Sequence, residues 1–554
     1  MKTLKLKKIF VGLALGLTVL VGFAFKEGEK NLFEIAKNIE IFTSMYRQIN
    51  MYYVDDTKPG DLMRKGIDAM LESLDPYTVY ISEAQIEDYR FMTNRVYGGI
   101  GATIREVDKD VFISEPYEGF PAAKANLRAG DKILAIDGES IKGWSTDEVS
   151  ERLKGQAGTS LKLKYIPLGS TEVKEISLTR ENVKMKDVSY YKMLGDSVGY
   201  LKLDAFTETA SAEVRTAVEE FTKQGAKGMI LDLRGNGGGL LRESVAIVNM
   251  FVPKGELVVT TKSRIEEQNK EHYALFPAIN EEIPLTILVD NMSASASEIV
   301  SGALQDLDRA VVVGSTTYGK GLVQNTVDLS YNSKLKLTIA KYYIPSGRCI
   351  QKIDYSSRDE IGAPQEVPDS VLKKFTTKAG RTVYDGRGIS PDVKVEDEEA
   401  GRIIGGIYAN ALFFKYANQY VSKHPSIAEP EKFRLSEEEF AAFKAMVKAA
   451  KVDYSTQSSS YLKRLKEISK RELYYGDAEA DFAALEDKLA PNVDRDLEKF
   501  SHQLKNILEN EIVSRYYFSE GRLRHTLSDD PVLETGIAYL NKEKQKSILT
   551  PNAN

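Results

Sequence analysis

Three closely spaced serines and a lysine further along the chain are the residues best suited to do chemistry. Ser293, Ser295 and Ser297 stand in the run Asn-Met-Ser-Ala-Ser-Ala-Ser-Glu, and Lys320 stands between two glycines. A serine hydroxyl attacks a carbonyl once a neighbouring base accepts its proton. None of the four histidines stands in a setting that suggests a Ser-His-Asp arrangement. Lysine is therefore the remaining candidate for the base.

The elements around the serines predict that they lie where a strand meets a helix. The apolar run 283–289 reads as a buried strand that ends in an Asp-Asn turn. Ile299, Ala303 and Leu307 then repeat at helical spacing, so the serines stand at a helix N-terminus. The free N–H groups there stabilise negative charge beside an attacked carbonyl. A plain helix start explains the serine run equally well when it is taken alone.

Lys320 has a setting that lets it act as a base. Near neutral pH this requires its pKa to fall by roughly three, or about 4 kcal/mol, through burial or a nearby cation. Lys320 follows the strand-like run 310–313 and lies between Gly319 and Gly321, so its stem can pass into the interior. Gln324 is a neutral residue that can orient the amine without raising its pKa.

The same stretch partly fits a phosphate-binding loop. Residues 314–320 match the first seven positions of G-x-x-x-x-G-K. Gly321 then replaces the Ser or Thr that would hold magnesium, and a strand-like segment, 322–329, follows where a helix should begin. We therefore expect no nucleotide here, and no metal or other cofactor elsewhere.

A second strand, glycine turn and helix lies upstream. Residues 228–234 read as a buried strand, and Gly-Asn-Gly-Gly-Gly and a helical run, 240–252, follow. Glycines at a strand end let backbone N–H groups approach a ligand closely, which suits an oxyanion hole. A tight structural turn would leave the same pattern.

These segments resemble the carboxy-terminal processing proteases, which are Ser-Lys peptidases of the tail-specific type with a PDZ domain. The serine run, the run Tyr-Gly-Lys-Gly-Leu-Val-Gln and the segments 336–343 and 388–392 carry the resemblance. It implies that Ser295 is the nucleophile, that Lys320 is the general base and that Gln324 positions the lysine.

The same resemblance implies an oxyanion hole and a peptide site. The N–H of Gly237 or Gly238 would pair with that of Ala296, and the two glycines are not distinguished. Residues 96–182 carry short strands and an Asp-Gly hairpin signal and resemble a PDZ domain. A glycine-rich turn is expected to bind the terminal carboxylate of a peptide, and it consists of Gly98, Gly99, Ile100 and Gly101. The basic Arg128 is a further residue expected to bind the peptide. A solvated surface arginine is an equally good account of Arg128.

The N-terminus has the pattern of a secretory signal or a signal-anchor. Lysines precede an uncharged, mostly apolar stretch, residues 9–25. Its length and its poor cleavage site favour slightly a retained anchor. We therefore expect an extracytoplasmic, periplasmic protein that contacts the inner membrane through this segment.

Length and composition predict several domains. The fold class expected is α/β and α+β multidomain, with a crotonase-like or ClpP-like αβ protease core, an inserted PDZ-like β domain and helical N- and C-terminal regions. The divisions are 1–30 for the signal or anchor, 31–95 for the helical N-terminal region, 96–182 for the PDZ-like domain, 183–395 for the protease core and 396–554 for the helical C-terminal module.

Composition also limits the partners. The net charge is −6 with acids and bases interspersed, so nucleic acid is not expected as a partner. Cys349 is the only cysteine, which excludes an intramolecular disulfide. The helical regions 31–95 and 396–554 are expected to serve packing, assembly into a homo-oligomer or partner binding.

The sequence thus predicts a serine endopeptidase that recognises the apolar C-terminus of a protein through its PDZ-like domain. Cleavage would proceed through an acyl-enzyme on Ser295, with Lys320 as the base. Two alternatives stay open. One is a catalytically silent PDZ scaffold, and the other is an enzyme gated by its substrate, an adaptor or an activator.

Overall fold

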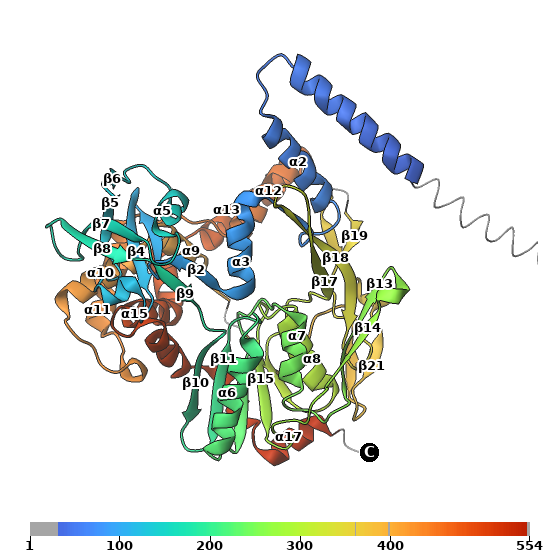
Figure 1. Cartoon of the computed structure of the whole chain (residues 1–554). Coiled ribbons are helices and arrows are strands. Elements are labelled where there is room, and N and C mark those ends of the chain that lie inside the picture. The colour runs from blue at the N-terminus through green and yellow to red at the C-terminus, as the bar shows by residue number, and fades with distance from the viewer. Residues whose placement is uncertain (1–31, 360–361, 397–398, 551–554) are drawn as a thin grey trace, which may run out of the picture.

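A six-stranded sheet forms the centre of the largest part of the fold (Figure 1). The computed structural model describes residues 32–359, 362–396 and 399–550. In sheet order the strands are β10 (Val188–Leu194), β11 (Val198–Leu203), β12 (Gly228–Asp232), β15 (Leu285–Val289), β16 (Val311–Gly314) and β23 (Val393–Lys394). β10 is antiparallel to β11, and the other neighbours are parallel. The central strands are buried on both faces, which explains their nearly continuous apolar sequence.

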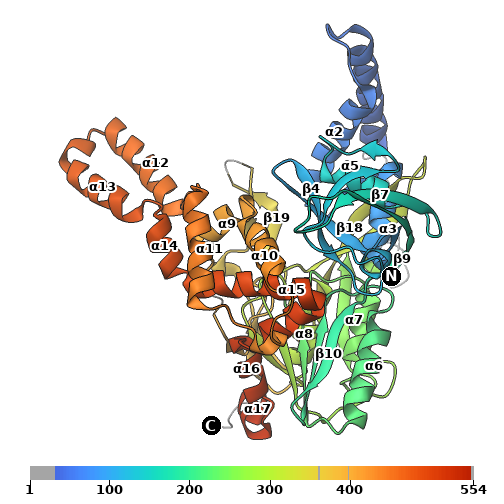
Figure 2. The ribbon, with the colours of Figure 1, turned by 90° about the vertical axis from the view of Figure 1, so that its left-hand side faces the viewer.

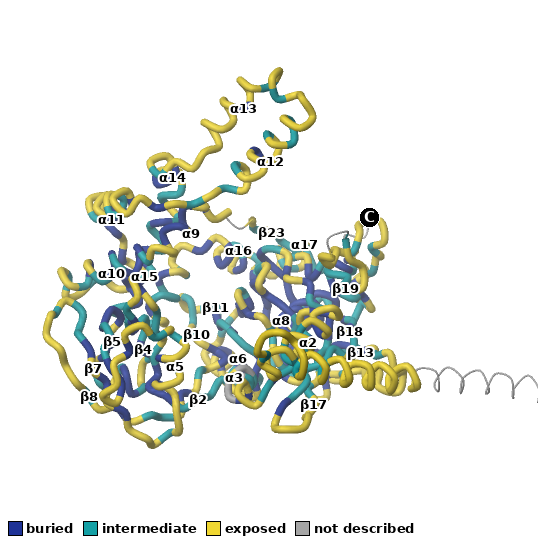
Figure 3. Tube along the Cα trace, turned by 90° about the horizontal axis from the view of Figure 1, so that it is seen from above, coloured by how far each residue is buried: buried dark blue, intermediate teal, exposed yellow. Residues whose placement is uncertain are grey.

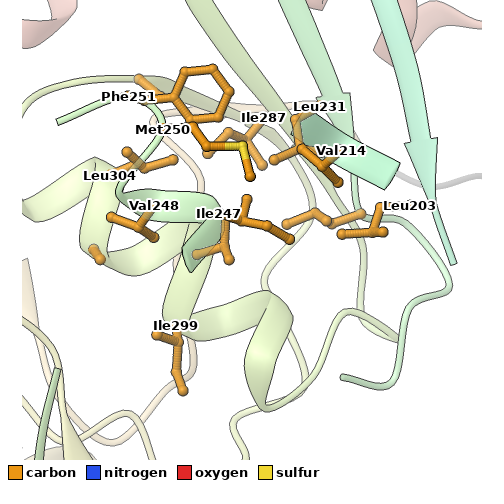
Figure 4. Close-up of a cluster of buried hydrophobic side chains, with 14 of the residues drawn as sticks. Leu203, Val214, Leu231, Ile247, Val248, Met250, Phe251, Ile287, Ile299 and Leu304 are labelled. Carbon is orange, nitrogen blue, oxygen red and sulfur yellow. The ribbon is translucent and has the colours of Figure 1, made fainter. Parts of the chain in front are cut away.

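Three helices pack into one hydrophobic core with this sheet, namely α6 (Ala210–Lys223), α7 (Leu241–Val248) and α8 (Ala296–Asp306). Figure 4 shows Ile247 of α7 together with Ile299 and Leu304 of α8 in this core. Every residue of α8 is buried. The N-terminus of α8, where the serines lie, is therefore held by packing along the whole helix.

The C-terminal residues return to cover the other face of the sheet. Leu533 of α16 (Pro531–Ala538) packs against Ile230 and Leu288, and α17 (Lys542–Leu549) contributes to the same cluster. Arg234 bonds the carboxylate of Asp530, the N-cap of α16, at 2.7 Å. The end of the region expected to be a separate helical module is thus built into the central sheet.

A second sheet brings the N-terminal region beside the central part. Its order is β1 (Val79–Ile81), β18 (Lys334–Tyr343), β13 (Leu257–Ser263) and β14 (Lys270–Tyr273), and β17 (Leu322–Asp328) also pairs with β18. Within the region expected to be helical, β1 is a strand that pairs with β18 in the register Val79↔Lys336. Smaller hairpins join β19 (Ile353–Arg358) to β20 (Pro364–Glu366) and β21 (Lys374–Thr376) to β22 (Thr382–Tyr384).

Residues 96–184 form a separate β domain with its own core. Its sheet contains β3 (Ala102–Val107), β4 (Asp110–Pro116), β5 (Lys132–Ile136), β6 (Glu139–Ser140), β7 (Ser160–Ile166) and β8 (Lys174–Thr179). β2 (Val96–Gly99) pairs with β9 (Glu181–Lys184), and the helices are α4 (Pro121–Lys124) and α5 (Thr146–Leu153). The Asp-Gly pair between β5 and β6 forms the hairpin that the sequence predicts.

Helices make up most of the remaining described chain. A helix spans residues 32–52, and α2 (Pro59–Glu72) and α3 (Ile86–Asn94) follow. Those of the C-terminal region are α9 (Arg402–Ala409), α10 (Leu412–Lys423), α11 (Glu437–Ala449), α12 (Gln457–Arg471), α13 (Tyr475–Leu489), α14 (Val493–Lys499) and α15 (Ser501–Leu527). The α12–α13 hairpin projects from the body (Figure 2), and most of its residues are exposed (Figure 3).

The predicted signal or anchor at residues 1–30 lies outside the described residues. In the part of the chain that the structure describes, no helix is both long and apolar enough to cross a membrane.

Candidate active site

Ser293 and Ser295 lie in the turn between β15 and α8, and Ser297 lies in the first turn of α8, so the serines stand at a strand-to-helix junction as the sequence predicts. The Asp290 carboxylate organises this turn, because it accepts the N–H groups of Met292 and Ser293. It also accepts the N–H of Gly235, which ties the turn to the glycine-rich loop after β12. The two strand-turn-helix segments therefore meet at one edge of the central sheet.

Hydrogen bonds distinguish Ser295 from its two neighbours. The Ser293 hydroxyl lies 2.9 Å from the Leu233 carbonyl, and the Ser297 hydroxyl lies 2.9 Å from the Asn236 carbonyl. Among the described residues, the Ser295 hydroxyl donates to no group, and this side chain is half-buried. Ser295 also has a positive φ of 56°, a sparsely populated conformation for a residue with a side chain. Ser293 and Ser297 are thus engaged in the fold, whereas the hydroxyl of Ser295 is available.

Lys320 lies in the loop between β16 and β17 and is half-buried. Burial, and secondly the nearby cation Lys336, lower the pKa of Lys320 to about 8, although Glu298 and Asp75 act in the opposite direction. Its Nζ lies 4.1 Å from the centre of the Tyr77 ring, a cation–π contact. A substantial fraction of this amine is therefore neutral near physiological pH.

Two buried side chains join the backbones of Ser295 and Lys320. The Glu298 carboxylate accepts the N–H of Ser295 at 2.7 Å and the N–H of Lys320 at 2.9 Å. The Tyr342 hydroxyl lies within hydrogen-bond distance of the carbonyls of both residues. Within the described residues, no hydrogen bond joins the Ser295 hydroxyl to the Lys320 amine. The two segments are thus adjacent, but their reactive side chains are not bonded to each other.

Gln324 does not contact Lys320 through a hydrogen bond in this structure. Its Nε2 donates to the Thr338 hydroxyl at 3.1 Å, and Thr338 in turn lies 3.3 Å from the Thr78 hydroxyl. The residue is on β17, the strand that directly follows the Lys320 loop. The proposed role of Gln324 in positioning the lysine stays a prediction.

The glycine-rich loop closely approaches Ser295. A Cβ added to Gly238 would lie 2.8 Å from the Ser295 Cβ and 2.9 Å from the Ala296 nitrogen. The N–H of Gly238 already donates to the Asn236 side chain at 2.9 Å. In the described part of the chain, the N–H groups of Gly237 and Ala296 have no acceptor. This difference favours Gly237 over Gly238 as the partner of Ala296 in an oxyanion hole.

The β domain contains a groove of about 1290 Å³ between β3 and α5. Ala102, Ile104 and Leu153 contribute to its lining. β3 pairs with β4 on one side only, so its other edge faces the groove. An extended peptide can add to such an edge, with its side chains in the groove.

The expected glycine-rich turn in this domain requires a correction. Gly98 and Gly99 belong to strand β2, where they pair with Asn182 and Glu181 of β9. Only Ile100 and Gly101 form the turn, and their carbonyls accept the N–H groups of Ala122 and Tyr117. Gly98 and Ile100 still line the groove. The prediction of a turn at Gly98 and Gly99 was wrong because strand β9, with which they pair, is distant in the sequence.

Arg128 is exposed and is not among the residues that line the groove. Its backbone N–H donates to the Asp131 carboxylate at 2.9 Å, which stabilises the turn before β5. A role for its side chain in binding a peptide stays a prediction.

The sequence predicts no role for four residues that lie around Ser295 and Lys320, namely Tyr77, Glu298, Lys336 and Tyr342. Glu298 carries a local signal, because the spacing Ser-x-x-Glu is typical of a helix start. The other three lie on segments that only the second sheet brings to Lys320. Among the described residues, no group of three or more His, Cys, Asp or Glu side chains is arranged to hold a metal ion.

The contribution of Lys336 can be measured through pH. Replacing it by Met removes the positive charge that lowers the pKa of Lys320, so that pKa should rise. In a plot of kcat against pH, we expect the rise in kcat to move to higher pH. Below pH 8, kcat should be several-fold lower than in the wild type. At pH values above the rise, it should be nearly unchanged. Lys394→Met, an exposed lysine on β23, is the matched control. A rise that does not move would contradict this assignment.

Three family models match the chain, described as peptidase family S41 over residues 197–357, PDZ domain over 91–166 and probable PDZ-protease, C-terminal helical domain over 403–540. A carboxy-terminal-processing protease from Bartonella bacilliformis is 34% identical over 380 residues, which cover 68% of this chain and 86% of the relative. The carboxy-terminal processing protease CtpA of Bacillus subtilis is 31% identical over 328 residues, or 59% of this chain and 69% of the relative. Among solved structures, the photosystem II D1 C-terminal processing protease matches with 28% identity and a TM-score of 0.35, covering 64% of this chain and 92% of the other.

Proposed function

Since this chain belongs to the carboxy-terminal-processing proteases of peptidase family S41, we propose that it cleaves proteins with a Ser295–Lys320 dyad after recognising their C-termini. The chain is a serine-type peptidase with a PDZ domain and a helical C-terminal domain. The observation that carries the proposal is that Glu298 and Tyr342 hold the backbone of Ser295, whose hydroxyl donates to no group among the described residues, next to that of Lys320, whose pKa is lowered to about 8. Both residues also stand in the two segments of the sequence that resemble this family.

In the proposed mechanism, the Ser295 oxygen attacks the scissile carbonyl while the neutral Lys320 amine accepts the serine proton. The N–H groups of Gly237 and Ala296 stabilise the resulting oxyanion. The intermediate collapses, the carbon–nitrogen bond breaks and Lys320 passes its proton to the leaving amine. The product is an ester on Ser295, which water hydrolyses with Lys320 again acting as the base.

The unbonded side chains favour an enzyme whose dyad completes its contacts when substrate or an adaptor binds. Lys320 contacts the Tyr77 ring and Gln324 donates to Thr338 in this structure, so in the proposed complex the Lys320 amine moves to the Ser295 hydroxyl and the Gln324 side chain turns toward Lys320. Both are side-chain movements within a preformed backbone, and catalytic hydrogen bonds often tighten only in the substrate complex. No observation favours a catalytically silent scaffold, since serine and lysine are both in place.

The groove between β3 and α5 is the proposed site for the C-terminus of a substrate protein. Its lining is mixed; the apolar part, which includes Ile104 and Leu153, suits an apolar terminal side chain, and the free edge of β3 suits an added strand. The N-terminal segment supports a further proposal, that the enzyme works outside the cytoplasm, in the periplasm at the inner membrane. We also propose that the helical regions serve assembly into a homo-oligomer or the binding of an adaptor.

Exchange of the substrate tail tests this recognition. The full-length protein should cleave a labelled unfolded polypeptide ending in Leu-Ile-Val with a kcat/KM about 10-fold to 100-fold higher than the same polypeptide ending in Asp-Asp-Asp. The physical reason is burial of the terminal side chain, worth about 1.5–3 kcal/mol for a residue such as Val. The identical internal sequence is the control. Equal cleavage of both polypeptides would refute recognition through the groove.

A further inference from the structure

Glu298 is a buried carboxylate with an unusual set of partners. It has no exposed surface and occupies the third position of α8. Its Oε2 accepts the N–H of Ser295 at 2.7 Å and that of Lys320 at 2.9 Å. Its Oε1 accepts the Thr317 hydroxyl at 2.6 Å and the Gly319 N–H at 2.7 Å. A single side chain thus holds the nucleophile turn and the loop of the base.

An ordinary helix cap does not explain these contacts. Two other helices of the chain begin with the same Ser-x-x-Glu pattern, at Ser145 with Glu148 and at Ser436 with Glu439. In both, the glutamate accepts the N–H of its own N-cap serine, at 2.7 and 2.8 Å. Three of the four donors to Glu298 come instead from the Lys320 loop. The extra bonds join two segments that a cap would leave independent.

We propose that Glu298 is the positioning residue of the dyad, because one oxygen of its carboxylate accepts the backbone N–H groups of both Ser295 and Lys320. The proposal rests on the proposed function of the two residues. Ser295 has a φ of 56° and a ψ of −112°, a conformation that persists only when its surroundings enforce it. Glu298 supplies part of that restraint through the Ser295 N–H. The next N–H, that of Ala296, has no acceptor among the described residues.

The ionised form of Glu298 can accept all four of these hydrogen bonds, because each oxygen of a carboxylate has two lone pairs. Three of the four donors are backbone N–H groups and the fourth is the Thr317 hydroxyl. Burial raises the pKa of Glu298 to about 7 although the four hydrogen bonds lower it. The negative charge also raises the pKa of Lys320. Glu298 therefore acts on the base through both position and charge.

Other titratable groups face the same pair from neighbouring elements, namely Lys336 and Tyr342 from β18 and Asp75 and Tyr77 from the segment before β1. All of them remain in a Glu298 variant. A change in the titration of Lys320 in that variant is therefore due to Glu298.

The test compares Glu298→Gln with the matched control Glu439→Gln in the full-length protein. Gln keeps the shape, but its NH₂ opposes N–H donors, so kcat should fall about 10²-fold with KM within about threefold. The ascending limb of the kcat profile should move to lower pH, because the charge that raises the pKa of Lys320 is gone. Glu439→Gln should retain the kcat and the limb of the wild type. The probe is the labelled polypeptide ending in Leu-Ile-Val.

A kcat for Glu298→Gln within about threefold of wild type, or an equal loss in Glu439→Gln, overturns the proposal. If Glu298→Gln does not fold, Thr317→Val replaces it, since that change removes one donor to Glu298 and keeps the charge. We then expect a kcat about 10-fold lower at unchanged KM, and a wild-type kcat overturns the proposal.

A second readout does not depend on cleavage. Competitive acetylation of Lys320 with acetic anhydride over a pH series, followed by mass spectrometry, measures the pKa of the amine. A lower pKa of Lys320 in Glu298→Gln than in the wild type supports the proposal. This holds even if the wild type cleaves no substrate, because the absence of cleavage refutes only the proposed function. An unchanged pKa of Lys320 in Glu298→Gln overturns the proposal about Glu298. The proposed function still stands in that case if the wild type cleaves the polypeptide.

Discussion

Replacing Lys320 by Arg should reduce kcat by about 10⁴-fold or more, and replacing Ser295 by Ala should reduce it at least as much. Arginine keeps the positive charge and much of the stem, but its pKa stays above about 12, so it supplies no neutral base near physiological pH. Lys320, in contrast, has a pKa lowered to about 8 by burial and by Lys336. Steady-state cleavage of the labelled polypeptide from pH 6 to 10 measures the loss.

The controls separate catalysis from folding. Lys394→Arg, an exposed lysine of β23, should have wild-type kcat, and the thermal unfolding of Lys320→Arg should resemble that of the wild type. Because serine and lysine act as one unit, the double variant Ser295→Ala with Lys320→Arg should be no slower than either single variant. Substantial activity in Lys320→Arg at neutral pH would exclude Lys320 as the base.

Gly238→Ala should reduce kcat by about 10²-fold or more and lower the free energy of unfolding by about 1–3 kcal/mol. The new Cβ would lie 2.7 Å from the Ala294 carbonyl and 2.8 Å from the Ser295 Cβ, which is closer than atoms approach without movement. The nearest atoms are backbone or the nucleophile itself. Either the glycine-rich loop or the Ser295 turn must therefore shift, and the proposed oxyanion hole lies between them.

Gly255→Ala is a control for backbone strain alone. Gly255 has a φ of 96°, close to the 98° of Gly238, but an added Cβ there would meet no atom within 4 Å. It should lower stability through strain yet leave kcat within about threefold of wild type. Denaturant unfolding and steady-state cleavage of both variants give the comparison. Equal kcat values for the two variants would show that the approach of Gly238 to Ser295 is unimportant for catalysis.

Local pattern was sufficient to predict much of the fold around the serines. The strand before the serines, the helix after them and the second strand-turn-helix all follow from runs of apolar residues that a turn interrupts. The family resemblance selected Ser295 and Lys320, and the comparisons confirm the family, the protease core and the PDZ domain. Neither the structure nor the comparisons test the roles of the individual site residues.

The sequence by itself determined the residue types and their order along the chain, because strands, helices and turns are encoded in short periodic patterns. Only the tertiary structure decided which groups face one another. Lys336 and Tyr77 lie beside Lys320 because β1 and β17 both pair with β18. Gly98 likewise lies in a strand because it pairs with the distant β9. The position of α16 depends on its packing against the central sheet. A pKa, a free N–H group or a hydrogen-bond partner is a property of neighbours in space, and no local spacing records those neighbours.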